Sequence, residues 1–327
     1  MKSKTLLKIG ILCFILGISL ISLRNRSFSG FSTLEKKVNE DYKKIDLYFC
    51  EKDDCESVIA DLINKSTKED CAFYDIDLEK ITNELVKDPY RLVTDNVCKN
   101  EIARKEDGNK ALMHNKFCIY DNKIISTGSF NPKKSSALKD NNNLIVIESY
   151  YLAKNYEDEF EELWNGIFGS GDKVKYPIIQ YGNVTIENYF CPEDKCEQHL
   201  IEKLNAGKEI YFLIFSFTDT DVSQKLIDLH NSGIKIQGVV EKQRINMQYE
   251  QYKKLRLNGI DVRADSNKYL LHDKTWIIDD IIIIGSYNPT SSGNTRNDEN
   301  ILIIKDAELA NKMKARFDEI YAKAQNI

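Results

Sequence analysis

The sequence predicts an α/β protein built from two copies of one unit, and three repeated patterns carry this prediction. The chain has 327 residues, 42% hydrophobic and 30% charged, which suffices for two domains with buried cores. A cysteine pattern, YFC-x-x-D-x-C, occurs at residues 48–55 and again 141 residues later. A His-x-Lys pair at 114–116 and a Gly-Ser-x-Asn-Pro segment at 128–132 recur after 158 and 157 residues. Because the order is the same, we expect two duplicated halves, residues 45–175 and 176–327.

Each half predicts a mixed β-sheet flanked by helices. Apolar runs and alternation mark the strands, and apolar residues at helical spacing mark the helices. The second half predicts elements in the order strand, helix, four strands and helix, at residues 209–217, 222–229, 234–240, 275–278, 281–284, 301–304 and 306–323. The first half parallels it, with strands and a closing helix at 71–76, 117–120, 123–127, 144–147 and 151–164. Two such halves most simply pack about a pseudo-twofold axis, where equivalent loops meet.

The first 30 residues differ from the rest of the chain. Three lysines precede an uncharged run at 9–23, and two arginines follow it. The run is shorter than the roughly 20 residues that span a bilayer, but it lengthens to 18 if Lys8 extends toward the headgroups. A cleaved secretory signal and a buried soluble helix are the alternatives to a retained signal anchor. We expect a single-pass transmembrane anchor over 1–30, with the catalytic part extracytoplasmic, or secreted if the segment is cleaved.

Four of the eight cysteines belong to the repeated pattern: Cys50, Cys55, Cys191 and Cys196. The spacing favours a short loop closed by a local disulfide bond in each half, in keeping with an oxidising compartment. Zinc fits less well, because structural zinc sites favour C-x₂-C pairs with four converging ligands. Four unpaired thiols are the remaining alternative, since connectivity cannot be deduced from sequence. The other cysteines, at 13, 71, 98 and 118, stand singly.

The two His-x-Lys pairs carry the chemistry that the sequence predicts. The candidate site residues, in equivalent pairs, are His114 and His272, Lys116 and Lys274, Ser129 and Ser286, and Asn131 and Asn288. On a strand, residues i and i+2 point to one face, so each histidine shares a face with its lysine. About a pseudo-twofold axis, this set suits a phosphoryl group: lysines neutralise its oxygens, asparagines donate hydrogen bonds, and imidazoles flank it for in-line displacement. Asp121 and Asp279, four residues after each lysine, lie in predicted hairpin turns, and we expect them to be structural.

The duplicated pattern, HxK(x)₄D followed by GSxN, resembles the phospholipase D superfamily over nearly the whole chain beyond the N-terminal segment. A single HxK would carry little weight, but the compound motif occurs twice at a near-constant offset. The resemblance implies two α/β halves, a phosphodiesterase site with no metal or other cofactor, and a covalent phosphohistidine intermediate. We expect a monomer, because both half-sites lie in one chain.

Two departures from the superfamily pattern make the predicted site asymmetric. The second motif is one residue shorter between Asp279 and Gly285, which a tighter turn can absorb. Members of the superfamily usually carry a carboxylate after each GSxN that contacts the histidine of the other half. Glu299 fills this place in the second half, whereas its counterpart is Asn142.

We therefore expect Glu299 to fix the tautomer of His114, the predicted nucleophile, while His272 protonates the leaving alkoxide. The superfamily also tends to use the N-terminal histidine as nucleophile. The physical argument alone leaves the roles open, because a carboxylate also raises a histidine pKa and would suit an acid.

These observations predict a membrane-anchored phosphodiesterase that hydrolyses a phospholipid to phosphatidate and its head-group alcohol. The net charge of −5 argues against a global electrostatic attraction to nucleic acid, although a local basic cleft stays open. A nuclease acting on DNA or RNA and a phosphatidyltransferase resembling cardiolipin synthase are the alternatives in the same chemistry. A catalytically silent binding module is disfavoured, because it would not need two complete sets of His, Lys and Asn.

Overall fold

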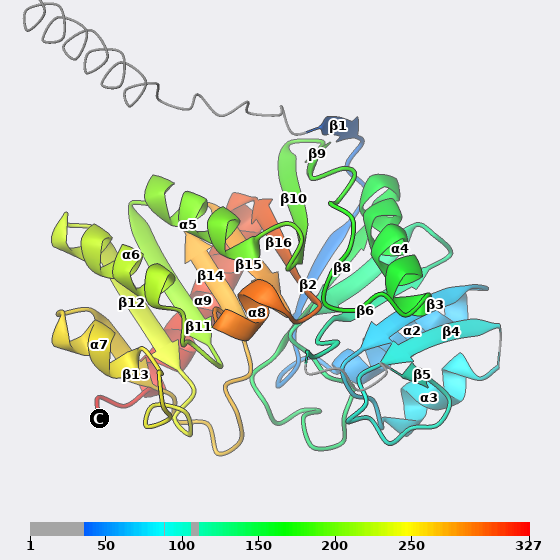
Figure 1. Cartoon of the computed structure of the whole chain (residues 1–327), viewed down its shortest axis with the longest axis horizontal. Coiled ribbons are helices and arrows are strands. Elements are labelled where there is room, and N and C mark those ends of the chain that lie inside the picture. The colour runs from blue at the N-terminus through cyan, green and yellow to red at the C-terminus, as the bar shows by residue number, and fades with distance from the viewer. Residues whose placement is uncertain (1–35, 88, 106–110) are drawn as a thin grey trace, which may run out of the picture. The chain divides into compact units, whose positions relative to one another are not determined.

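Two mixed β-sheets, one for each half, form the framework of the computed structural model, which describes residues 36–87, 89–105 and 111–327 (Figure 1). The first sheet has the order β2 (Ile45–Phe49), β8 (Asn143–Glu148), β7 (Ile124–Gly128), β6 (Lys116–Tyr120), β3 (Glu69–Phe73), β4 (Tyr90–Thr94) and β5 (Arg104–Lys105). The second has the order β1 (Lys37–Glu40), β9 (Ile178–Tyr181), β10 (Val184–Cys191), β16 (Glu299–Lys305), β15 (Ile281–Gly285), β14 (Lys274–Ile278), β11 (Glu209–Ile214), β12 (Lys235–Val240) and β13 (Asp261–Ala264). From β10 onward the second order repeats the first strand for strand, which confirms the predicted duplication.

The strand β1 breaks this correspondence. It precedes the first half in sequence, yet it pairs in parallel with β9 at the edge of the second-half sheet. The chain therefore begins its described part in the sheet of the second half before it builds the first.

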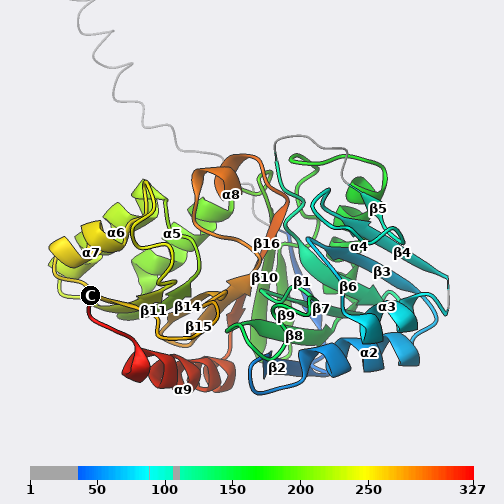
Figure 2. The same cartoon turned by 90° about the horizontal axis from the view of Figure 1, so that it is seen from below.

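Helices cover the sheets of both halves (Figure 2). The first half carries α2 (Cys55–Lys65), α3 (Glu79–Leu85) and α4 (Tyr150–Trp164). The second carries α5 (Cys196–Ala206), α6 (Thr220–Asn231), α7 (Tyr252–Leu257), α8 (Ser291–Thr295) and α9 (Ala307–Lys323). The closing helices α4 and α9 begin alike, because Ser149 and Asp306 each accept a hydrogen bond from the backbone N–H three residues on.

Three hydrophobic clusters hold the layers together. The central cluster draws on both halves: Phe117 and Ile145 of the first sheet, Leu302 of the second, and Tyr156 and Phe317 of the closing helices. The two outer clusters each belong to one half, one beneath α2 and α3 and one beneath α5, α6 and α7. The halves thus share a core, which fixes the loops at the ends of their inner strands against each other.

The two predicted local disulfide bonds, Cys50–Cys55 and Cys191–Cys196, are confirmed. Each joins the end of a strand to the start of the next helix. A third disulfide bond, which the sequence analysis missed, joins Cys71 on β3 to Cys118 on the neighbouring β6. Cys98 is a buried free thiol.

The predicted membrane anchor, residues 1–30, lies outside the described residues. Within the described part of the chain, no helix is both long enough and apolar enough to cross a bilayer.

Candidate active site

The two histidines lie just before β6 and β14, and the opposite half of the chain holds the backbone of each. His114 N donates to Asp298 O at 3.0 Å, and His272 N donates to Asn141 O at 2.9 Å. The acceptors directly precede Glu299 and Asn142, the two residues that the sequence analysis compared. The same backbone contacts therefore bring each of these side chains to the histidine of the other half.

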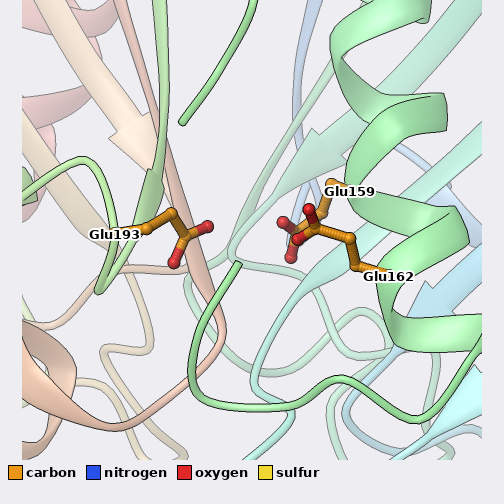
Figure 3. Close-up of side chains that lie close together, drawn as sticks. All are labelled: Glu159, Glu162 and Glu193. Carbon is orange, nitrogen blue, oxygen red and sulfur yellow. The ribbon is translucent and has the colours of Figure 1, made fainter. Parts of the chain in front are cut away.

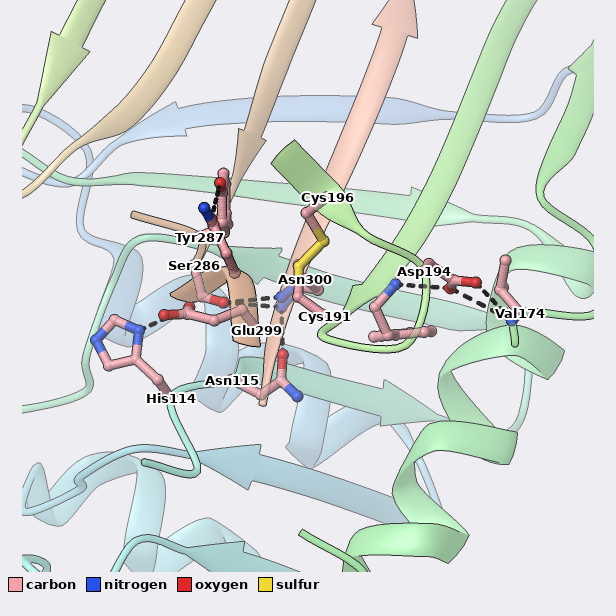
Figure 4. The surroundings of a disulfide bond; sticks show 12 residues. His114, Asn115, Val174, Cys191, Asp194, Cys196, Ser286, Tyr287, Glu299 and Asn300 are labelled. Carbon is pink, nitrogen blue, oxygen red and sulfur yellow. Dashed lines mark hydrogen bonds and ion pairs between the residues drawn. A yellow bond between two sulfur atoms is a disulfide. The ribbon is translucent and has the colours of Figure 1, made fainter. Parts of the chain in front are cut away.

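Nδ1 of each imidazole ring is hydrogen-bonded to a residue of the other half, and this contact fixes the tautomer. Glu299 Oε2 lies 2.8 Å from His114 Nδ1 (Figure 4). On the other side, His272 Nδ1 lies 2.9 Å from Asn142 Oδ1 and 3.2 Å from the carbonyl oxygen of Ser129. An ionised carboxylate and a carbonyl oxygen only accept, so with Glu299 ionised Nδ1 carries the proton in each ring. Nε2 of each histidine is thereby left for chemistry.

The two motif serines hold the residues that contact the histidines. Ser286 Oγ accepts from Asn300 N at 3.0 Å (Figure 4), and its hydroxyl donates to the carboxylate of Glu299. Ser129 Oγ accepts from Asn143 N at 3.0 Å and donates to Asn142 Oδ1 at 3.0 Å. The hydroxyl proton of each serine is thus committed to a neighbouring side chain.

The glycine before each serine permits this close packing. Gly128 and Gly285 have φ of +149° and +147°, and a Cβ on either would lie 2.4 or 2.2 Å from a backbone carbonyl oxygen of the next strand. Only glycine fits at these two positions without moving the strand.

The motif lysines are buried beside the histidines. Lys116 and Lys274 are each 2% exposed, and each Nζ donates to the carbonyl oxygen of its own motif's histidine at 2.5 Å. Burial lowers the pKa of Lys116 to about 7. The pKa of Lys274 is lowered too, first by burial and then by the charge of Lys116. In the part of the chain that the structure describes, neither Nζ lies within ion-pair distance of a carboxylate, so an anionic ligand would favour the charged form of both lysines.

The histidines and both asparagines line one cavity of about 610 Å³, to which both halves contribute. Oδ1 of Asn131 and of Asn288 is buried and has no hydrogen-bond partner in the described part of the chain. The cavity thus brings together the predicted His and Asn pairs, with the lysines directly behind the histidines.

Buried charge sets the electrostatics of the site. Burial lowers the pKa of both histidines well below the usual value, and the two lysine charges add to the effect. Burial raises the pKa of Glu299 to about 8. The charges of Lys116 and Lys274 oppose this rise, and a bound phosphodiester anion favours the protonated form of both lysines. With both lysines protonated and Glu299 ionised, the site carries one net positive charge, which a phosphodiester monoanion neutralises.

The family comparison covers both halves. The family model described as "Cardiolipin synthase, PLD-like domain" matches residues 47–164 and 200–321. This chain belongs to the phospholipase D superfamily. The prediction of a phosphodiesterase of the hydrolase class is confirmed by this match and by the curated relatives.

The curated relatives match less than half of this phospholipase D-like chain. Phospholipase D from Rickettsia bellii is 28% identical over 141 residues, which are 42% of this chain and 70% of the relative. Mitochondrial cardiolipin hydrolase from Chlamydomonas reinhardtii is 29% identical over 118 residues, 36% of this chain and 53% of that protein. Among solved structures, phosphatidylserine synthase from Haemophilus influenzae shares the fold over 89% of this chain and 88% of its own, with a TM-score of 0.64 and 11% identity.

The motif aspartates of this phospholipase D-like chain lie away from the cavity. Asp121, with a φ of 48°, accepts from the backbone and hydroxyl of Thr67 at 2.9 and 3.0 Å. Asp279, with a φ of 52°, accepts from the backbone N–H groups of Lys208 and Glu209. Each ties a hairpin turn to the segment that enters the adjacent strand.

Two aromatic residues beside the histidines escaped the sequence analysis. The ring centroid of Tyr74 lies 5.1 Å from that of His114, and Lys116 Nζ lies 5.1 Å above Tyr74. Phe215 repeats the arrangement at 4.7 Å from His272 and 5.0 Å from Lys274 Nζ. Tyr74 directly follows β3, and Phe215 directly follows the equivalent strand β11. The two residues are 141 positions apart, as are the two cysteine patterns, and this shared offset is the signal that could have revealed them.

The carboxylates Asp95 and Glu241 were also missed. Asp95 Oδ2 accepts from Met113 N at 3.0 Å, and Glu241 Oε2 accepts from Leu271 N at 2.7 Å. Each therefore fixes the residue that precedes a histidine. The sequence offers little signal for them, because one is Asp and the other Glu, and their offset differs from that of the motifs.

Behind the histidines the two halves differ in charge. Asn115 donates to Glu159 Oε1 at 2.9 Å. Glu159 shares an acidic cluster with Glu162 and Glu193, in which one carboxylate oxygen of each residue lies within 4.8 Å of the other two (Figure 3). The counterpart of Glu159 in the second half is Arg316, whose guanidinium pairs with Glu51 at 2.7 Å. Burial, followed by the neighbouring carboxylates, raises the pKa of Glu159 well above its usual value.

Proposed function

We propose that this protein is a phospholipase D-type phosphodiesterase that hydrolyses a phospholipid to phosphatidate and its head-group alcohol through a phosphohistidine intermediate. The observation that carries the proposal is the pair of imidazoles in one cavity, each with Nδ1 engaged by the other half and Nε2 left for the phosphoryl group.

In the first step, His114 Nε2 attacks phosphorus and the bond to the leaving alkoxide breaks. The bound phosphodiester anion offsets the two lysine charges that, with burial, lower the pKa of His272 in the free protein, and the protonated His272 then donates its Nε2 proton to that alkoxide. Lys116 and Lys274 stabilise the charge that builds on the non-bridging oxygens, together with the amide groups of the two asparagines. In the second step, His272 takes a proton from water, the water oxygen attacks phosphorus, and the N–P bond to His114 breaks.

The asymmetry of the Nδ1 contacts supports these roles. A carboxylate stabilises the positive charge that His114 acquires as the N–P bond forms, as in a catalytic triad. The neutral amide of Asn142 stabilises an imidazolium less, so His272 gives up its proton more readily. The charged partner therefore suits the nucleophile and the neutral partner suits the acid.

A lipid substrate is supported by two further observations. The curated relatives are named phospholipase D and cardiolipin hydrolase. The apolar run at 9–23, flanked by basic residues, suits a membrane anchor that would hold the cavity near a bilayer. We include this anchor, and an extracytoplasmic catalytic part, in the proposal.

Turnover of three substrates in parallel tests the proposal. The full-length protein in detergent micelles is given phosphatidylcholine, cardiolipin and a single-stranded oligodeoxynucleotide, with His114→Ala as the inactive control. We expect phosphatidate from a phospholipid in the wild type and none in the variant. Cleavage of the oligonucleotide alone would overturn the lipid assignment in favour of a nuclease.

A further inference from the structure

We propose that Arg244 binds a second anionic group on the leaving alcohol of the substrate, so that the enzyme selects lipids whose head group carries a further phosphate. The proposal rests on the proposed function, because it takes His272 as the acid that faces the leaving group.

Arg244 belongs to the His272 side of the cavity. It follows β12 and lines the same cavity as both histidines. Its guanidinium carbon lies 4.8 Å from the ring centroid of Phe215. That ring also packs against His272 and lies 5.0 Å from Lys274 Nζ. The side chains of Arg244, His272 and Lys274 therefore all contact one aromatic ring.

The charge of Arg244 has no ion-pair partner in the part of the chain that the structure describes. Its Nε is buried without a hydrogen-bond acceptor there, and no described carboxylate lies within ion-pair distance of the guanidinium. By contrast, Lys133, another cation at the cavity, forms an ion pair with Asp75. The charge of Arg244 lowers the pKa of the nearby Glu250, but burial outweighs this effect and raises that pKa to about 7. A guanidinium in this state favours an anionic ligand.

In the described part of the first half, the equivalent place holds no cation. Asp95 and Glu241 hold equivalent places before the two histidines, and three residues beyond them stand Cys98 and Arg244. Cys98 is buried and bonds weakly to a backbone carbonyl. Among the described residues that line the cavity, Lys133 of the first half is neutralised by Asp75, so the unpaired arginine charge lies beside His272, where the leaving alcohol departs.

The planar fork of an arginine matches the oxygens of a phosphate group. Cardiolipin meets this chemistry, because its leaving alcohol is phosphatidylglycerol, which carries the second phosphate. Phosphatidylglycerol is the matched comparison: the leaving alcohol is again a glycerol, but it carries no charge.

The experiment compares kcat/KM for cardiolipin and phosphatidylglycerol in the same mixed micelles. The proteins are the wild type, Arg244→Gln, Arg244→Lys and the control Lys242→Gln. Lys242 is exposed on the same segment and bonds to Gln325, so the control removes one positive charge outside the cavity. Circular dichroism checks the fold of each variant.

We expect Arg244→Gln to lower kcat/KM for cardiolipin by about 10- to 100-fold, the range for a lost charged hydrogen bond, and to leave that for phosphatidylglycerol within about twofold. Arg244→Lys should recover part of the loss, and Lys242→Gln should match the wild type. An equal loss on both lipids, or none on cardiolipin, would overturn the role of Arg244. Failure of the wild type on both lipids would instead overturn the proposed function, so the two failures are distinct.

Discussion

Glu299 Oε2 lies 2.8 Å from Nδ1 of His114, whereas the matching contact to Nδ1 of His272 comes from Asn142 Oδ1 at 2.9 Å. A serine of the Gly-Ser-x-Asn segment holds each of the two partners in place. The site is thus nearly symmetric in shape and asymmetric in charge. This difference between one carboxylate and one amide is what separates the roles of the two histidines.

The covalent intermediate is expected on His114 only. With an activated substrate whose leaving group needs no proton, such as a p-nitrophenyl phosphodiester, His272→Ala should accumulate phosphohistidine slowly. His114→Ala should trap none with any substrate. Acid-quenched protein, digested and mapped by mass spectrometry, locates the label. Label on the peptide that contains His272 in the wild type would reverse the assignment.

Removing the negative charge of Glu299 should abolish turnover without unfolding the protein. In Glu299→Gln the amide cannot stabilise an imidazolium on His114, and comparable changes in a catalytic triad cost about 10⁴-fold in kcat. Asn142→Ala is the matched variant on the other side, and it should cost much less, because the Ser129 carbonyl still accepts from His272 Nδ1. Equal losses in the two variants would contradict an asymmetric site.

Each buried lysine should be needed for the chemical step. Lys116→Met and Lys274→Met remove the charge with little change in volume, and each should lower kcat by about 10²–10³-fold. Lys123→Met, an exposed change on the hairpin that follows Lys116, should have no effect. Steady-state kinetics measures kcat of each variant, and circular dichroism checks that the variant is folded. A near-wild-type rate in either buried variant would show that the halves do not share one site.

Anion binding should weaken as the pH rises above 7. Lys116 has a pKa of about 7 in the free protein, so its charge is present below that pH and is lost above it. Sulfate keeps its charge across this range, and its dissociation constant should rise by up to roughly tenfold per pH unit above 7. Isothermal titration calorimetry from pH 6 to 9 measures this. Lys116→Met should bind weakly throughout, and a pH-independent wild-type affinity would contradict the lowered pKa.

Most of the fold could be predicted because the repeat appears in the sequence at near-constant offsets. The hairpin strands β14 and β15 and the helix α9 fall within a residue or two of their predicted ranges. What escaped prediction depends on long-range pairing. β1 is short and polar, and nothing local in it indicates its partner β9 in the other half.

The same reasoning separates what could and could not be predicted of the site. Residue spacing placed each histidine beside its lysine, and the resemblance to the superfamily pointed to Glu299 after the second motif. The Cys71–Cys118 bond was missed because it depends on the register of β3 against β6. Arg244 was missed because it lies outside the repeated motifs and its counterpart in the first half is a cysteine, so no second copy drew attention to it.

Chelators should leave turnover unchanged. The two lysines supply the positive charge that a metal ion would otherwise provide to the phosphoryl oxygens. In the described part of the chain, three candidate ligands converge only at Glu159, Glu162 and Glu193, and none of these lines the cavity. Activity measured in excess EDTA tests this. Loss of turnover that a divalent metal restores would contradict the proposed mechanism.

The acidic cluster behind His114 should make the protein less stable as the pH rises. Burial, followed by the charges of Asp194 and Glu162, raises the pKa of Glu193 to about 7. In the unfolded chain a glutamate loses its proton near pH 4.3. The folded protein therefore binds more protons between about pH 4.5 and 7, and stability contributed at low pH is lost through this window.

Glu193→Gln removes the share of this dependence that Glu193 contributes, since the amide does not titrate. We expect its melting temperature to equal that of the wild type at pH 4.5 and to exceed it at pH 8, by about 2–4 °C for each kcal/mol gained. Glu202→Gln, an exposed change on the following helix, should keep the wild-type pH profile. Thermal denaturation followed by circular dichroism from pH 4.5 to 8 provides the curves. Parallel profiles for the wild type and Glu193→Gln would mean that the pKa of Glu193 is the same in the folded and unfolded states, so that burial in the cluster does not hold its proton.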